Sequence, residues 1–113
     1  MPSLLLATRP PGEQTALNLR RWDEVLHNSD LQNTPGRIET DRHGRIVMSP
    51  PPAPRHGQLQ YQVGSLLEKF MPPGKIITEC PVSTADGVKG VDVAWASPEC
   101  WAELGNRSCF VRA

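Results

Sequence analysis

The sequence has no excess of either charge. Its 12 Lys and Arg residues balance 12 Asp and Glu residues, so the formal net charge is zero. Proteins that bind nucleic acid through overall electrostatic attraction usually carry a clear basic excess, and this chain does not. A small basic patch is the one local exception. Its members are close together in the sequence: Arg37, Arg42, Arg45 and Arg55.

The chain is also poor in cysteine motifs and in long apolar runs. Its three cysteines have no CxxC spacing, which argues against a zinc site built from them. An odd number of cysteines without a signal peptide is typical of reduced thiols, so we expect a cytoplasmic protein. The run Leu4-Leu5-Leu6 is far too short to span a membrane, so no membrane partner is expected.

No phosphate-binding P-loop, GxGxxG turn or HExxH helix is present. With 113 residues, the chain has the length of one domain with a modest core. We expect residues 1–13 to form a flexible arm and residues 14–113 to form the domain. Twelve prolines fall mainly in short clusters that separate the expected elements.

Hydrophobic periodicity and turn residues predict a mixed α/β (α+β) fold. The expected elements are a helix from Thr15, as its cap, to about His27, strands at 37–40 and 45–48, a helix from about Pro54 to Met71, strands at 75–82 and 88–96, a short helix at 98–104, and the start of a strand at 109–111. Residues 28–36 are expected to form a loop. Residues 41–44 are expected to form a hairpin turn in which Gly44 takes a positive φ.

Both predicted strand pairs are expected to belong to one sheet. Helix 54–71 should pack one apolar stripe on that sheet. The stripe consists of residues at helical spacing: Leu59, Val63, Leu66 and Phe70.

Asp92 is the strongest candidate for chemistry. It interrupts an apolar, strand-forming run, Val91-Asp92-Val93-Ala94-Trp95-Ala96-Ser97. A lone carboxylate in such a run is costly unless it is paired or binds a metal ion. Asp92 could hold Mg²⁺ and orient water for phosphodiester cleavage. Alternatively, it is a solvated strand residue or pairs with Lys89.

Three further residues are weaker candidates. Glu39 could approach a metal site, or it could lie on the solvent face of an edge strand. His56, at the start of the second long helix, could be a general base or a phosphate contact, or simply a surface residue. Glu79 could reach across to Asp92, or it could be an ordinary cross-strand charge.

Two stretches resemble a known family, the Uma-two restriction endonucleases. Residues 37–57 contain a hairpin of the pattern [RY]-x-E-x-x-x-x-G-x-[IV]-x-M-S-P, a proline-rich link and a helix that opens with His. Residues 78–97 resemble the second block of that family. The two blocks occur in the family's order and at similar spacing.

The resemblance implies the PD-(D/E)XK nuclease superfamily, with a mixed restriction-endonuclease-like sheet flanked by helices. It implies Mg²⁺-dependent hydrolysis of DNA. Asp92 matches the family's first metal-binding Asp, Glu39 its hairpin Glu, and His56 the His at the helix start. We therefore take Asp92, Glu39 and His56 as candidate catalytic residues, and Asp92 and Glu79 as candidate metal ligands.

The chain departs from the family pattern in two places. Val91 stands where the family usually has Pro before the metal-binding Asp. The chain also ends at Ala113, about where the family's next strand, carrying a second acid, would begin. We therefore expect a nuclease domain that lacks its C-terminal part and is inactive alone. The alternative is a non-catalytic interaction module. The open sheet edge predicts a homo-dimer or a marginally stable chain.

Overall fold

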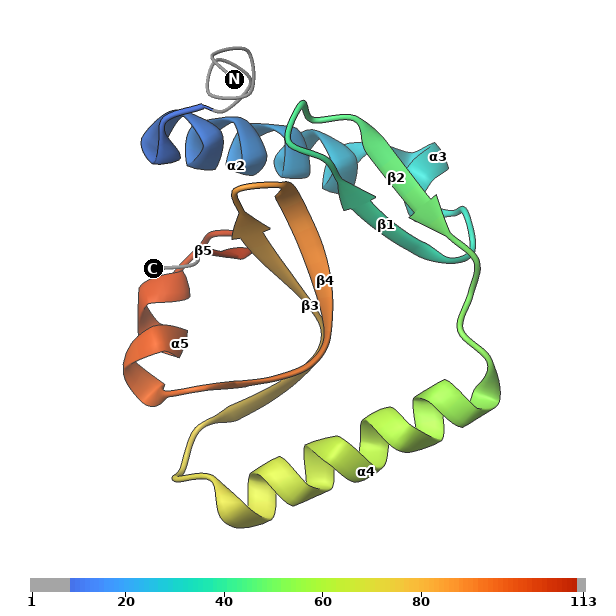
Figure 1. Cartoon of the computed structure of the whole chain (residues 1–113), viewed down its shortest axis with the longest axis vertical. Coiled ribbons are helices and arrows are strands. Elements are labelled where there is room, and N and C mark those ends of the chain that lie inside the picture. The colour runs from blue at the N-terminus through green and yellow to red at the C-terminus, as the bar shows by residue number, and fades with distance from the viewer. Residues whose placement is uncertain (1–8, 112–113) are drawn as a thin grey trace, which may run out of the picture.

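A computed structural model describes residues 9–111 (Figure 1). The elements are α2 (Pro11–His27), α3 (Ser29–Gln32), β1 (Arg37–Thr40), β2 (Ile46–Ser49), α4 (Pro54–Phe70), β3 (Lys75–Thr84), β4 (Gly87–Ala96), α5 (Pro98–Leu104) and β5 (Phe110–Val111). The predicted mixed α+β class is confirmed. None of the described helices has the length and apolar character needed to cross a membrane.

The first helix begins earlier than predicted. Pro10 is its N-cap and Pro11 its first residue, a position where the missing N–H of proline costs nothing. The Thr15 hydroxyl donates to the Pro11 carbonyl at 2.9 Å, so Thr15 lies inside the helix and does not cap it. The expected arm is correspondingly shorter, and residues 1–8 of it lie outside the described part of the chain.

The predicted loop after α2 contains the short helix α3. Asn28 caps it, because its side-chain oxygen accepts a hydrogen bond from the Leu31 N–H at 3.1 Å. Sequence periodicity cannot detect a helix of four residues, which is why only a loop was expected.

The predicted hairpin turn between β1 and β2 is confirmed. Asp41 Oδ1 accepts hydrogen bonds from the N–H groups of His43 (2.8 Å) and Arg45 (2.9 Å). Gly44 has a φ of 79°, as the turn requires. These contacts set the register, in which Thr40 lies opposite Ile46.

The strands form two sheets, and the prediction of one sheet is wrong. The β1–β2 hairpin is separate from a three-stranded sheet of order β4-β3-β5, in which β3 is antiparallel to β4 and parallel to β5. The link between β1 and β4 is made by side chains of β1, which accept hydrogen bonds from the backbone of β4, and not by backbone pairing. Thr40 Oγ1 accepts from the Val88 N–H at 2.9 Å, and Glu39 Oε2 accepts from the Gly90 N–H at 2.5 Å.

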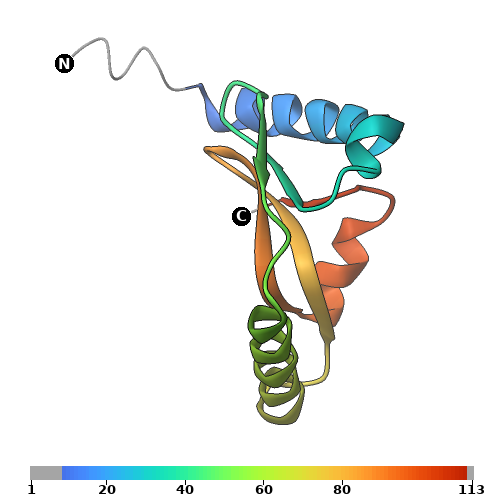
Figure 2. The same cartoon turned by 90° about the vertical axis from the view of Figure 1, so that its right-hand side faces the viewer.

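Helix α2 lies across the turn end of the β3–β4 hairpin, as Figures 1 and 2 show. Its apolar side joins a small core of buried residues: Trp22, Val25, Val88 and Cys109. A buried amide completes the docking. Asn18 is 1% exposed and donates to Ser83 Oγ (2.9 Å) and to the Thr84 carbonyl (2.8 Å).

Helix α4 lies at the other end of that hairpin, and its predicted packing face is wrong (Figure 2). The predicted apolar stripe is exposed: Leu59 58%, Val63 39%, Leu66 56% and Phe70 73%. The neighbouring stripe, with Gln60 and Gly64, faces the sheet. A Cβ on Gly64 would lie 3.5 Å from Ile76 and 3.8 Å from Val93, so the glycine allows a close approach of the helix. Periodicity alone does not distinguish two adjacent stripes.

The replacement Asn18→Ala should reduce the free energy of unfolding by about 2–3 kcal/mol, because Ser83 and the Thr84 carbonyl would lose a buried partner. Urea unfolding measures the change. Asn33→Ala, at an exposed position, is the matched control and should change stability by less than about 0.5 kcal/mol. Equal effects of the two replacements would show that the buried amide does not fasten α2 to the hairpin.

The three thiols should differ in reactivity. Cys80 and Cys109 are buried and Cys100 is exposed. Burial raises the pKa of Cys109 to about 11 and also raises the pKa of Cys80. Both thiols therefore stay protonated at pH 8, and only the thiolate reacts. We expect a thiol-reactive disulfide reagent to modify Cys100 rapidly in the folded protein and all three cysteines in denaturant. Rapid modification of Cys109 in the folded state would contradict the packing.

Candidate functional site

The β3–β4 ladder has one interruption, where Glu79 faces Asp92. Pairing runs in constant register from Lys75↔Ala96 to Thr84↔Gly87, and this is the one position of the ladder where the two strands do not pair. Glu79 has a φ of 50° and is the one non-glycine residue at positive φ in the described chain. Such a conformation is strained and typically occurs at functional sites. Two carboxylates therefore oppose one another where the strand bends.

Helix α4 brings two side chains to this pair. His56 and Gln60 are one helical turn apart and point to the same side. Gln60 Nε2 donates to Glu79 Oε1 at 3.2 Å and to the Asp92 carbonyl at 2.6 Å. His56 Nε2 lies 3.3 Å from Asp92 Oδ1. That nitrogen is shielded from solvent and makes no hydrogen bond. A protonated imidazole at this distance forms an ion pair with Asp92, so the contact between His56 and the carboxylate is electrostatic.

Arg37, from the start of β1, supplies a positive charge between the carboxylates. Its Nε and Nη2 donate to Glu79 at 3.2 and 3.3 Å, and its Nη2 also contacts Asp92 Oδ1. Like charges directly opposite one another in a sheet are destabilising, and the guanidinium neutralises this repulsion. The hydrogen bond from Arg37 lowers the pKa of Asp92, with smaller contributions from the charges of Arg37 and His56. Asp92 is therefore ionised at neutral pH.

Three of the four sequence candidates converge in the structure. One ligand atom from each of His56, Glu79 and Asp92 lies within 4.8 Å of the other two. Glu39 does not join this group, because its carboxylate accepts the Gly90 N–H and links β1 to β4. It is in a structural contact close to the site. The alternative pairing of Asp92 with Lys89 is wrong, since Lys89 Nζ donates to the Thr40 carbonyl at 3.0 Å.

Arg37 and Gln60 were not among the site residues predicted from the sequence. The spacing of each from a predicted site residue is the sequence feature that points to it. Arg37 is two residues from Glu39, so the two side chains share one face of β1. Gln60 is four residues from His56, so the two share one face of α4. Neither signal is specific enough to identify a site without the fold.

The donor set suits a divalent cation. Two carboxylates and an imidazole are ligands for Mn²⁺, and the carboxylates alone suit Mg²⁺ with several waters. The shielded His56 nitrogen without a hydrogen bond is the structural sign that a partner fits there. The Arg37 guanidinium lies on the same oxygens, so it and a cation compete for Asp92 and Glu79.

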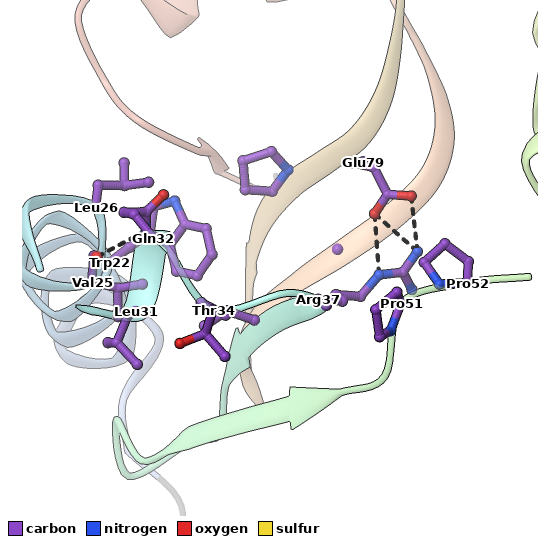
Figure 3. Close-up of a pocket in the computed structure, with 14 residues that line it drawn as sticks. Trp22, Val25, Leu26, Leu31, Gln32, Thr34, Arg37, Pro51, Pro52 and Glu79 are labelled. Atoms are coloured by element: carbon purple, nitrogen blue, oxygen red, sulfur yellow. Dashed lines mark hydrogen bonds and ion pairs between the residues drawn. The ribbon is translucent and has the colours of Figure 1, made fainter. Parts of the chain in front are cut away.

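Two cavities adjoin the site. One, of about 420 Å³, has Arg37 and Glu79 at one end and Trp22 and Val25 at the other (Figure 3). The second, of about 350 Å³, lies between α4 and β4 and includes His56 and Asp92 in its wall. The guanidinium therefore stands at the boundary between an apolar cavity and the candidate cation site.

Comparisons of the chain with protein-family models, with curated proteins and with solved structures found no match.

The replacement Arg37→Gln should raise the pKa of Asp92 towards the ordinary value for Asp, because it removes the main hydrogen bond that favours the ionised form. Because the pKa of Asp92 is lower in the folded than in the unfolded state, the ionised carboxylate stabilises the fold at pH values above its unfolded pKa. This stabilisation is lost as the pH falls through the folded pKa. Titration of the Asp92 carboxyl carbon by ¹³C NMR measures the shift. An unchanged pKa in the variant would contradict the ion pair.

Proposed function

We propose that this chain carries the cation site of a divalent-cation-dependent phosphodiester hydrolase that acts on DNA, and that, as the sequence predicts, the chain alone binds the cation without cleaving DNA efficiently. One observation carries the proposal: Glu79 and Asp92 oppose one another at the break in the β3–β4 ladder, with the unsatisfied His56 nitrogen beside them. Such a cluster of carboxylates and imidazole is the minimal equipment for cation-assisted hydrolysis of a phosphate ester. The resemblance to the Uma-two endonucleases supplies DNA as the substrate class and Mg²⁺ as the cation.

Each side chain has a distinct task in this proposal. Asp92 and Glu79 hold the cation, which supplies positive charge to stabilise the negative charge that develops on the phosphate. His56 Nε2, which lies 3.3 Å from Asp92 Oδ1, would in its neutral form accept a proton from the attacking water. Gln60 keeps Glu79 turned towards Asp92 through its two hydrogen bonds.

One feature supports the proposed setting. The three cysteines are all free, which is typical of a reducing compartment, so we propose a cytoplasmic protein. The exposed arginines of the β1–β2 turn lie at the end of that hairpin away from the site, where Arg42 pairs with Asp86 and Arg45 pairs with Asp41.

A second function, protein interaction without catalysis, is favoured by the exposed apolar stripe of α4. Its residues follow a 4-3-4 spacing, which is typical of paired helices: Leu59, Val63, Leu66 and Phe70. This alternative accommodates the homo-dimer expected from the sequence, with the helix as the contact instead of the sheet edge. Replacing Leu66 and Phe70 with Lys would separate the two functions, since only self-association should change.

Asp92→Asn should weaken the binding of Mg²⁺ or Mn²⁺ by about 10–100-fold and lower any cation-dependent cleavage of plasmid DNA with it, because disturbing even the outer partners of a metal site has an effect of this size. Plasmid nicking and cation binding by calorimetry measure the two effects in the same preparation.

Asp86→Asn is the matched control, since Asp86 lies at the exposed tip of the β3–β4 hairpin and pairs with Arg42, away from the site. It should leave both activity and cation binding unchanged. A wild-type protein that binds neither cation at millimolar concentration would refute the proposed function. Binding without cleavage would support a site that needs more protein to complete it.

A further inference from the structure

We propose that Arg37 is the internal counter-cation of this site, and that it exchanges the carboxylates of Asp92 and Glu79 for a substrate phosphate when a divalent cation binds. The inference rests on the proposed function, because it assigns the same carboxylates to the cation. It adds a substrate-positioning residue on β1 that neither the sequence motifs nor the family resemblance assigns.

Arg37 occupies the place between Asp92 and Glu79 that a cation would take. Its guanidinium contacts both carboxylates, with an ion pair of 3.0 Å to Glu79 and a closer one to Asp92. A divalent cation on the same oxygens would place like charges in contact, which is unfavourable even though both carboxylates are half exposed and solvent weakens the repulsion. Cation binding therefore requires the guanidinium to leave at least Asp92.

A guanidinium released from the carboxylates has a cavity beside it. Figure 3 shows Arg37 at the end of the apolar cavity, beside Pro51 and Pro52 and next to Glu79. Among the described residues, the charged residues that line this cavity are Arg37 and Glu79. A cation bound by Glu79 and Asp92 would occupy both carboxylates that hold the guanidinium. The freed guanidinium then faces an open space without an internal partner.

The chemistry of the guanidinium favours a phosphate as its new partner. A planar guanidinium with parallel N–H donors matches the oxygens of a phosphate in a two-pronged contact. Arg37 shares Glu79 with the cation site, so a phosphodiester bound to the guanidinium would lie against the cation. Arg37 would thus hold the substrate phosphate only after the cation is in place, which orders cation binding before substrate binding.

Calorimetry with Mn²⁺ on the full chain tests the exchange. Arg37→Gln should bind Mn²⁺ about tenfold or more tightly than the wild type, because the competing charge is gone. Arg45→Gln, in the same hairpin but 73% exposed and paired with Asp41, should bind Mn²⁺ like the wild type. With Mn²⁺ present, Arg37→Gln should bind a phosphorothioate DNA duplex about tenfold more weakly.

A second measurement needs no variant. In the wild type, the NMR signal of the Arg37 Nε–H group, which donates to Glu79, should move as Mg²⁺ is added and stop moving when the site is saturated. This readout decides the matter alone if Arg37→Gln does not fold. A static signal in a protein that binds Mg²⁺, or unchanged Mn²⁺ affinity in the variant, overturns the exchange but leaves the proposed function standing. Absence of Mn²⁺ binding in both proteins removes the proposed function and the exchange with it.

Discussion

The structure depends on one electrostatic constraint: Glu79 and Asp92 face one another across two paired strands, and their repulsion has to be offset. The offset comes from Arg37, which reaches the pair from a different sheet. This contact, with those of Glu39 and Thr40 to β4, joins the β1–β2 hairpin to the three-stranded sheet. The Arg37 contact that offsets the repulsion between the two carboxylates therefore also helps to hold the two sheets together.

The same constraint explains the orientation of α4. A helix that packed its most apolar stripe on the sheet would place Leu66 and Phe70 inward and turn His56 and Gln60 away from the carboxylates. Instead Gly64 brings the helix backbone close to the sheet, and Gln60 hydrogen-bonds at the break in the ladder. The consequence is an exposed apolar surface, which the protein tolerates so that imidazole and amide groups can reach the site.

Much of the fold could be predicted from the sequence, because strands, turns and helices depend on local patterns. The Asp41–Gly44 turn, the β3–β4 hairpin and the bounds of α4 follow from such signals. The separation into two sheets could not be predicted, because it depends on Thr40 and Glu39 replacing backbone pairing with side-chain hydrogen bonds. The site could be predicted in part. Asp92 is recognisable as a charge in an apolar run, whereas the role of Arg37 depends on its contacts with Glu79 and Asp92, which are 42 and 55 residues away in the chain.

The central proposal is that Glu79 and Asp92 form a cation site beside His56, and that Arg37 fills this site with its own charge. Crystals soaked in Mn²⁺ and measured near the manganese absorption edge test this most directly. We expect an anomalous peak between the two carboxylates, with the Arg37 guanidinium moved away from Asp92. A map without a peak at that position, with Arg37 still bound to both carboxylates at saturating Mn²⁺, would contradict it.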